Sequence, residues 1–392
     1  MTRWMSNLPK DENGRPYIIV DNKKLRYGYT TGTCAAAASK TSAHILLRGE
    51  IPELVEITLP DGTVIGLEAE DVSVENGKVS CAVRKDSGDD IDATDGLLIY
   101  SEVSMRSDGK IVIYGGEGVG VITRNGLDQP VGSPAINSVP LSMIREALED
   151  VCDSLGHSDG LTAKIYVPGG EGIAMRTFNP RLGIENGISI LGTTGMVEPM
   201  SETAFIGAIR AEMKMKRTSG QDHFLIVPGN YGRANIDSMN DIDGDSAIKC
   251  SNFIGATIDY AMEMDCRGIL LVGNIGKLVK IAGGIMNTHS RWADCRMEIM
   301  AANSIMAGAD AETAKAIMSC ISTDDALDIL CERGYFKETI SSLIDNIMFH
   351  LNHRTRGDIP IGVILFSSKY GKLGESANVP HLIDKLKEMQ NK

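Results

Sequence analysis

The sequence predicts an α+β domain with a hairpin-rich sheet, followed by an α/β domain with a mainly parallel sheet and a helical insertion. Short apolar strands separated by turn residues fill residues 54–113, which predicts antiparallel hairpins. From residue 187 onward, apolar strands alternate with longer helical stretches, which predicts βαβ units around a parallel sheet. The 392 residues suffice for two domains, which we place at residues 1–185 and 186–392.

A glycine and threonine motif, Gly28-Tyr29-Thr30-Thr31-Gly32-Thr33, stands near the start of the first domain. Alanine is the best helix former, and the alanines of residues 35–38 predict a helix from about residue 34 to 48. The threonine hydroxyls are N-cap candidates. The N–H groups at the start of this helix favour an anion, although an ordinary capped helix explains the same residues.

Five strands are expected in the hairpin region, at residues 55–59, 64–67, 79–83, 99–105 and 110–114. A Gly-Gly-Glu-Gly motif then occurs twice, around Glu117 and Glu171. We interpret it as one supersecondary unit, a strand followed by a glycine turn, that is used twice. Each copy places a carboxylate between glycines, where a backbone can approach a ligand closely. Solvated glutamates at two hairpin ends are the alternative.

Strands of the second domain are expected at residues 188–191, 224–227, 269–272 and 361–366. Two of them run into turns with the pattern Gly-Asn-x-Gly, which are Gly229-Asn230-Tyr231-Gly232 and Gly273-Asn274-Ile275-Gly276. The carboxyl ends of parallel strands form the ligand crevice of an open α/β sheet, so these turns predict a nucleotide-like ligand. Two ordinary glycine turns are the alternative. Helices at residues 307–355 are expected as an insertion before the last strand, with an apolar stripe in the core.

The composition excludes several classes of partner. With 39 Lys+Arg against 52 Asp+Glu, the net charge of −13 provides no basic excess for nucleic acid. No apolar run reaches about 18 residues, and the polar N-terminus resembles no secretory signal, so we expect a cytoplasmic protein without membrane contact. The eight cysteines never form Cys-x-x-Cys, which predicts reduced core thiols and no metal site. A homo-oligomer remains open.

The densest polar cluster is Asn287-Thr288-His289-Ser290-Arg291, with Asp294 three residues further on. Histidine can move protons at neutral pH, and a nearby carboxylate can fix its tautomer. We therefore predict catalytic roles for His289 and Asp294. A structural histidine, and a simple ion pair of Asp294 with Arg291, are the alternatives.

Several of these blocks occur in the order found in a known family. The segment RYGYTTGTCAAAA at residues 26–38, the two Gly-Gly-Glu-Gly motifs, GTTGMVEPM at residues 192–200, and the stretch from GKLVK to NTHS at residues 276–290 resemble the CbiD family, the cobalt-precorrin-5B C(1)-methyltransferases. The resemblance covers about residues 24 to 375.

The resemblance implies methyl transfer from S-adenosylmethionine to ring carbon 1 of cobalt-precorrin-5B, giving cobalt-precorrin-6A in the oxygen-independent branch of cobalamin (vitamin B12) biosynthesis. The family is not built like other corrin-ring methyltransferases, so no cofactor residues are carried over from them. Cobalt belongs to the substrate. In-line displacement from a sulfonium needs orientation and charge matching, without a protein-bound metal or a covalent nucleophile.

That chemistry suggests roles for the motif residues. The carboxylate arms of the tetrapyrrole are expected to meet hydroxyl, amide and cationic groups, which are Thr30, Thr31, Gly32, Thr33, Lys277 and Arg291, with Arg124 and Arg176 as further examples. The strand-end turns are expected beside the methyl donor, through Gly229, Asn230, Gly232, Gly273, Asn274 and Gly276. His289 either assists proton movement or orients the substrate, and Glu117 and Glu171 either face the sulfonium or end hairpins.

Two other function classes fit parts of the sequence. A non-catalytic tetrapyrrole-binding or carrier protein uses the same crevice but transfers no methyl group. A nucleotide-dependent ligase or kinase needs a phosphate loop, and the turn Gly273-x-x-Gly276-Lys277 lacks both the P-loop spacing and its Ser or Thr.

Overall fold

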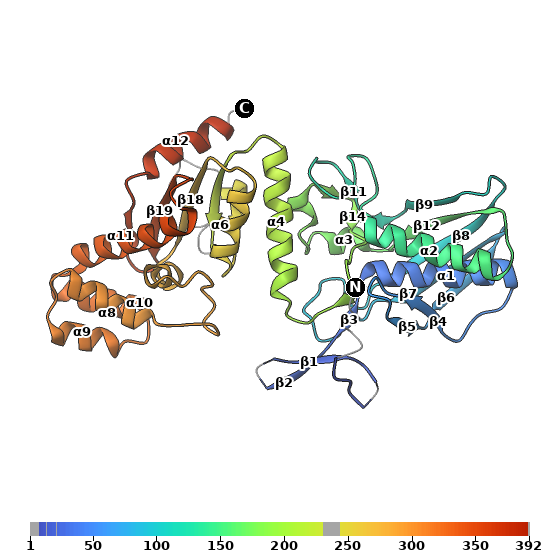
Figure 1. Cartoon of the computed structure of the whole chain (residues 1–392), viewed down its shortest axis with the longest axis horizontal. Coiled ribbons are helices and arrows are strands. Elements are labelled where there is room, and N and C mark those ends of the chain that lie inside the picture. Colours follow the sequence, from blue (N-terminus) through green and yellow to red (C-terminus); the bar gives the residue numbers. More distant parts are fainter. Residues whose placement is uncertain (1–7, 13, 21, 230–243, 391–392) are drawn as a thin grey trace. The chain divides into compact units, whose positions relative to one another are not determined.

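The computed structural model describes residues 8–12, 14–20, 22–229 and 244–390. The chain forms two compact units, Met1–Glu202 and Thr203–Lys392, each with its own sheet and core (Figure 1). The predicted fold class is confirmed, because the first unit is α+β with hairpins and the second is α/β with a mainly parallel sheet. No helix of the described residues is long and apolar enough to cross a membrane.

The first unit is built on a five-stranded sheet with the order β6-β7-β8-β12-β9, in which β12 and β9 are parallel and the other neighbours antiparallel. Its strands are β6 (Glu70–Glu75), β7 (Lys78–Arg84), β8 (Leu98–Arg106), β9 (Ile111–Gly115) and β12 (Gly160–Tyr166). Helices α1 (Thr31–Arg48) and α2 (Ser138–Ser154) pack on each other and on this sheet (Figure 1). Alternate strand residues such as Cys81 and Val83 face this core.

Helix α1 begins at Thr31, earlier than the predicted start near residue 34. The reason is its N-cap, because the Thr30 hydroxyl accepts a 3.2 Å hydrogen bond from the N–H of Thr33. The predicted alanines of residues 35–38 are fully buried, and their small side chains allow close packing against α2 and the sheet. Gly49, with φ of 80°, ends the helix in the left-handed conformation that glycine adopts most easily.

Five short strand pairs accompany this sheet in the described part of the first unit. They are β1 (Tyr17–Val20) with β2 (Lys23–Arg26), β3 (Gly28–Tyr29) with β15 (Met196–Val197), β4 (Val55–Thr58) with β5 (Val64–Leu67), β10 (Gly118–Val119) with β14 (Gly187–Ile188), and β11 (Val121–Ile122) with β13 (Ile184–Glu185). The prediction that residues 188–191 form a strand of the second domain's sheet is wrong, because β14 pairs with β10. Both β14 and β15 follow residue 185 and pair with strands of the first unit.

The two Gly-Gly-Glu-Gly motifs have different local structures. The first spans the end of β9 and the start of β10, and the second opens the short helix α3 (Gly170–Ala174). The prediction of one supersecondary unit used twice is therefore wrong. The motifs instead meet through their backbones, because a Cβ at Gly118 would lie 1.8 Å from the Val167 oxygen, and a Cβ at Gly170 would lie 2.4 Å from the Gly118 oxygen. Only glycine permits this approach.

The second unit has a five-stranded sheet with the order β17-β16-β18-β19-β20, in which β20 alone is antiparallel to its neighbour. The strands are β16 (His223–Val227), β17 (Ile248–Lys249), β18 (Gly268–Asn274), β19 (Ile361–Ser367) and β20 (Gly371–Glu375). Strand residues alternate between two helical layers, since Ile226 packs in the larger core and Leu225 packs with α12 (Val379–Gln390). The strands predicted at residues 224–227, 269–272 and 361–366 are confirmed.

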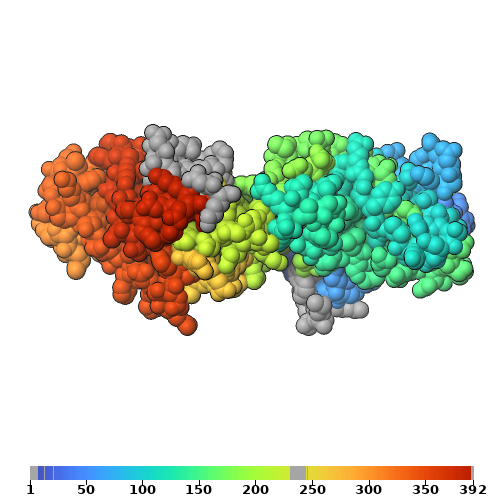
Figure 2. Space-filling view, turned by 90° about the horizontal axis from the view of Figure 1, so that it is seen from above, coloured from blue at the N-terminus to red at the C-terminus, as the bar shows by residue number. Residues whose placement is uncertain are grey.

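Most of the helices of the second unit cover the other face of the sheet. They are α4 (Glu202–Thr218), α6 (Ile254–Glu263), α7 (Ile275–Leu278), α8 (Arg296–Met306), α9 (Ala311–Met318), α10 (Thr323–Glu332) and α11 (Phe336–Thr355). The predicted helical insertion is confirmed, since α9, α10 and α11 precede β19, and it lies in the orange to orange-red part of this unit's surface (Figure 2). Helix α6 begins only at Ile254, because residues 248 and 249 form β17.

All eight cysteines are free thiols. Five are buried, as predicted for core residues, whereas Cys295 and Cys331 are exposed and Cys320 is half-buried. Burial raises the pKa of the Cys34 thiol to about 12, and that of Cys250 likewise.

Candidate functional site

The parallel sheet of the second unit has a topological switch point between β16 and β18. The chain forms β16 first, adds β17 on one side of it, and then adds β18 and β19 on the other side. In open parallel sheets, ligands bind beyond the carboxyl ends of the strands at such a point. Here Gly229 follows β16, and Asn274 is the last residue of β18.

Polar groups from neighbouring strand ends converge at this edge. The Asn274 side chain accepts a 2.8 Å hydrogen bond from the N–H of Gly276 and donates to the Ser368 hydroxyl at 3.2 Å. Asn274 therefore caps α7 and links the ends of β18 and β19. Lys277, on α7, donates to the carbonyl oxygen of Ser251, which follows β17. We call this group, Gly229, Ser251, Asn274, Lys277 and Ser368, the strand-end cluster.

Lys277 is the cation of the strand-end cluster. Burial lowers the pKa of this half-buried side chain, and the bond to Ser251 is long at 3.5 Å. Gly229 has φ of +101°, and a Cβ built on it would lie 3.5 Å from Lys277 Nζ. A glycine at this position therefore places no side chain of its own beside the ammonium, and an ammonium has three donors to share with an anionic ligand.

The structure gives less support for a donor contact of three other predicted residues, Gly273, Asn230 and Gly232. A Cβ at Gly273 would lie 2.9 Å from Pro228 Cγ and 3.0 Å from Leu278 Cγ, so the absence of a side chain at Gly273 serves packing. Asn230 and Gly232 lie outside the described residues. A role of these three residues beside the donor stays a prediction.

The predicted polar cluster around His289 is attached to the same edge of the sheet. Buried Thr288 donates its N–H to the carbonyl of Asn252, the residue after Ser251, at 2.9 Å. His289 and Arg291 are exposed, and the N–H of Arg291 donates to His289 Nδ1 at 3.1 Å. Because Nδ1 is an acceptor, the neutral imidazole carries its proton on Nε2. This arrangement favours donation to a substrate oxygen over proton abstraction.

Asp294 contacts Arg296 and Lys280, whereas the partners expected from the sequence are His289 and Arg291. Its carboxylate pairs with Arg296 at 2.5 and 3.0 Å and lies 3.6 Å from Lys280 Nζ. The hydrogen bond from Arg296, followed by the charges of Arg296 and Lys280, lowers the pKa of Asp294. Among the described residues no hydrogen bond joins Asp294 to His289, whose tautomer is fixed by a backbone N–H. A direct catalytic role of Asp294 stays a prediction.

The threonines of the first motif lie in the first unit, with their hydroxyls turned inward. Thr31 Oγ1 accepts from the N–H of Leu191 at 2.9 Å, and Thr33 Oγ1 donates to the carbonyl of Gly195 at 2.6 Å. Gly32 packs against Pro140 and donates its N–H to Leu191. These contacts hold residues 189–195 against the start of α1. The predicted contact of Thr30, Thr31, Gly32 and Thr33 with a carboxylate arm stays a prediction.

Glu117 and Glu171 also belong to the first unit, and both are exposed. The carbonyl of Glu117 accepts a 2.8 Å hydrogen bond from the N–H of Val167, whereas Glu171 lies in the first turn of α3. The glycines of the two motifs meet, while the two carboxylates face solvent. Their contact with the sulfonium stays a prediction.

Comparison with known proteins decides the family. The family model described as CbiD matches residues 18–199, and the model described as CbiD, C-terminal domain, matches residues 287–377. A protein of Alkaliphilus metalliredigens (strain QYMF) named cobalt-precorrin-5B C(1)-methyltransferase is 46% identical, over 95% of this chain and 97% of its own length. A protein of the same name from Thermoanaerobacter sp. (strain X514) is 44% identical, over 92% and 98%.

The chain belongs to the CbiD family. The crystal structure of a cobalamin biosynthesis protein (cbiD) from Archaeoglobus fulgidus is 28% identical, covers 76% of this chain and 95% of that chain, and superposes with a TM-score of 0.40. The resemblance expected from the sequence motifs is confirmed. In this CbiD chain, the matched ranges include the threonine motif and the His289 loop, and Gly229 and Lys277 lie between them.

Two residues of this CbiD chain that sequence reasoning missed, Lys280 and Trp292, shape the loop around His289, residues 288–294. Lys280 is only 3% exposed, although it is a lysine, and its ammonium bonds to the loop's backbone. Trp292 is 61% exposed, although it is a large apolar residue. The available signals were a lysine inside the apolar run of residues 278–282 and one of only two tryptophans in a polar stretch.

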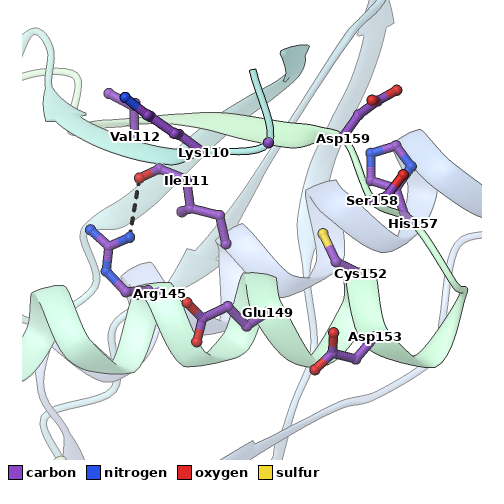
Figure 3. Close-up of a pocket in the computed structure, with 11 residues that line it drawn as sticks. Lys110, Ile111, Val112, Arg145, Glu149, Cys152, Asp153, His157, Ser158 and Asp159 are labelled. Carbon is purple, nitrogen blue, oxygen red and sulfur yellow. Dashed lines mark hydrogen bonds between the residues drawn. The ribbon is translucent and has the colours of Figure 1, made fainter. Parts of the chain in front are cut away.

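A separate hollow of about 510 Å³ lies in the first unit (Figure 3). Arg145, Glu149 and Cys152 project into it from α2, toward the strand that carries Ile111. Arg145 donates to the Ile111 carbonyl at 3.1 Å. None of the predicted site residues line this hollow, and its cations and carboxylates are mixed. Among the described residues, no group of three His, Cys, Asp or Glu side chains is arranged to hold a metal ion.

Proposed function

We propose that this protein transfers a methyl group from S-adenosylmethionine to ring carbon 1 of cobalt-precorrin-5B, giving cobalt-precorrin-6A in anaerobic cobalamin biosynthesis. The observation that carries the proposal is the 46% identity, over 95% of this chain, with a relative named cobalt-precorrin-5B C(1)-methyltransferase. That name describes a catalyst, which favours methyl transfer over a carrier role.

The strand-end cluster fits a small polar donor. Gly229 carries no side chain, and Asn274 and Ser368 offer neutral hydrogen-bonding groups at the switch point. These groups suit the hydroxyls and the amino acid end of S-adenosylmethionine. Lys277 offers its ammonium to a carboxylate arm of the tetrapyrrole.

When bound, the donor supplies an electrophilic methyl group on a positively charged sulfur. A bond forms between the methyl carbon and ring carbon 1, the carbon–sulfur bond breaks, and sulfur keeps the electron pair. The residues of this chain then have to hold the two molecules in line, because alignment can supply a large part of the rate gain in such a displacement. His289, which presents Nε2–H, is suited to hold a substrate oxygen.

The test incubates the purified protein with cobalt-precorrin-5B and S-adenosylmethionine labelled in its methyl group. We expect a ring product labelled at carbon 1 and an equal amount of S-adenosylhomocysteine. A carrier protein binds the tetrapyrrole and gives no labelled ring, and that result overturns the proposal.

The position of the donor is tested by a matched pair of variants. Gly229→Ala and Gly220→Ala both place a side chain at positive φ, +101° and +92°, but only Gly229 belongs to the strand-end cluster, whereas a Cβ at Gly220 would meet no atom within 4 Å. We expect calorimetry to show weaker S-adenosylhomocysteine binding for Gly229→Ala alone. Equal affinities for the two variants would place the donor elsewhere.

A further inference from the structure

A buried lysine closes the loop of residues 288–294, which we call the clamped loop. Lys280 Nζ donates to the carbonyl of Thr288 at 3.1 Å and to that of Ala293 at 2.8 Å. It also lies 3.6 Å from a carboxylate oxygen of Asp294. One ammonium therefore holds both ends of the loop, and charge-assisted bonds of this kind are stronger than neutral ones.

The tip of the clamped loop is a turn with a defined geometry. The carbonyl of His289 accepts from the N–H of Trp292 at 3.1 Å, and the His289 ring accepts from the N–H of Arg291. Trp292 is 61% exposed. The guanidinium carbon of Arg291 lies over the Trp292 ring, 5.9 Å from the ring centroid. A large flat apolar surface beside a cation is thus presented on a loop with fixed ends.

This combination fits a flat conjugated ring that carries carboxylates. Indole faces stack on flat conjugated rings, and guanidinium groups bind carboxylates with directed hydrogen bonds. The clamped loop is also continuous with the strand-end cluster, because Thr288 bonds to Asn252 through its N–H at 2.9 Å and its hydroxyl at 3.4 Å. A partly conjugated macrocycle with carboxylate arms has both of the required features.

We propose that Trp292 is the surface on which the tetrapyrrole macrocycle stacks, that Arg291 binds one of its carboxylate arms, and that Lys280 is a positioning residue that holds the loop. The proposal rests on the proposed function, since it names the macrocycle of that reaction as the occupant. The adenine of the methyl donor is the competing occupant, and the experiment separates the two.

The first test measures binding to the full chain by calorimetry, with cobyrinic acid as a stable corrinoid that carries carboxylates and with S-adenosylhomocysteine as the donor probe. We expect Trp292→Ala to weaken cobyrinic acid binding about 5- to 10-fold, and Trp292→Phe to retain most of the affinity, because a ring still stacks. S-adenosylhomocysteine binding should be unchanged in both. If Trp292→Ala weakens only S-adenosylhomocysteine binding, or weakens neither, the proposal is overturned.

The second test uses catalysis to separate stacking from a folding defect. Trp292→Ala should raise the KM for cobalt-precorrin-5B about 5- to 10-fold and leave the KM for S-adenosylmethionine unchanged. An unchanged KM for cobalt-precorrin-5B overturns the stacking proposal and leaves the proposed function intact. If the wild-type protein itself methylates no cobalt-precorrin-5B, the proposed function fails first, and calorimetry still decides whether Trp292 binds the corrinoid.

The role of Lys280 has its own readout. Trp4→Phe leaves Trp292 as the single tryptophan, so its fluorescence reports on the loop. In this background Lys280→Met should lower the fluorescence anisotropy of Trp292 and weaken cobyrinic acid binding, whereas the exposed-lysine control Lys315→Met should do neither. Unchanged anisotropy in Lys280→Met contradicts the clamp.

Discussion

The hydroxyl of Thr33 donates a 2.6 Å hydrogen bond to the carbonyl oxygen of Gly195. Both residues belong to distinctive motifs that are far apart in the sequence, GYTTGT and GTTGMVEP. The N–H of Thr30 donates to the same carbonyl at 3.1 Å, so the two motifs form one structural element in the first unit. The start of α1 is thereby held by the backbone of a segment 160 residues away, as the Thr31 to Leu191 bond also shows.

Replacing the Thr33 hydroxyl should destabilise the protein. Thr33 is fully buried, and Thr33→Val keeps its shape but removes the donor to Gly195, whose carbonyl retains the N–H of Thr30. We expect the free energy of unfolding to fall by about 1–2 kcal/mol. Urea denaturation measures this, with Thr33→Ser as the control that keeps the hydroxyl. A Thr33→Val protein of unchanged stability contradicts the structural role assigned to this contact.

Lys277→Met should behave in the opposite way, losing substrate affinity without losing stability. Burial lowers the Lys277 pKa below the ordinary 10.5, so the unfolded chain binds this proton more tightly than the folded one. The charged Lys277 therefore destabilises the folded protein most at pH values below its folded pKa. This penalty becomes smaller as the pH rises toward 10.5. At pH 7 the variant should be at least as stable as the wild type, and the difference should shrink as pH approaches 10.5.

The same variant should raise the KM for cobalt-precorrin-5B. A hydrogen bond to a charged group contributes about 1.5–3 kcal/mol, which corresponds to roughly 10- to 100-fold. Steady-state kinetics with each substrate varied in turn provides the measurement. A raised KM for S-adenosylmethionine instead would reassign Lys277 to the donor.

The fold of the second unit could be predicted well from the sequence because its strands are buried on both faces. Residues 224–227 and 269–272 are continuous apolar runs, and such runs between helices identify a parallel sheet. One error concerned residues 188–191, which were expected in this sheet, whereas β14 pairs with β10 of the first unit. A pairing of two residues carries no periodic signal, and it depends on a distant partner such as β10.

The candidate site was predicted only in part, for a related reason. Glycine turns after apolar strands located the switch point, because the sequence itself fixes which residues follow each strand. The role of Lys280 could not be predicted, because its partners are the backbone carbonyls of Thr288 and Ala293. Every residue has a backbone carbonyl, so the sequence does not show which ones a lysine will contact. Likewise, the sequence does not reveal which backbone groups the threonine hydroxyls of the first motif contact, because Leu191 and Gly195 are distant in the sequence.

Thiol labelling should follow burial. Iodoacetamide at pH 8 should modify exposed Cys295 and Cys331 rapidly, because the thiolate is the reactive form and these thiols are accessible. Cys34 and Cys250 should remain unmodified in the folded protein, since burial raises their pKa values to about 12. Mass spectrometry of peptides identifies the labelled sites, with urea-unfolded protein as the control in which all react. Rapid labelling of Cys34 before unfolding contradicts its position in the core.

The glycines and glutamates of the Gly-Gly-Glu-Gly motifs should have separate effects. Gly118→Ala forces a methyl group against the Val167 oxygen at a φ of +70°, which should cost roughly 3 kcal/mol or more. Gly172→Ala, in the second motif, meets no atom within 4 Å and should be tolerated. Glu117→Gln and Glu171→Gln should not change stability, because both side chains are exposed. Thermal unfolding compares the four variants, and equal losses for the two glycine variants contradict the packing described.

The His289 ring should act through Nε2, and two variants can separate that role from the shape of the loop. The side-chain oxygen of His289→Asn can replace Nδ1 as the acceptor for the N–H of Arg291, while Nε2 is lost; His289→Ala loses both. We expect both variants to slow methyl transfer. In the Trp4→Phe background only His289→Ala should change the fluorescence of Trp292, because it removes the acceptor for the Arg291 N–H in the turn that carries Trp292. Single-turnover rates with bound cobalt-precorrin-5B measure the chemical step. Full activity in His289→Asn would show that Nε2 is not needed, and the ring would then serve only to shape the turn.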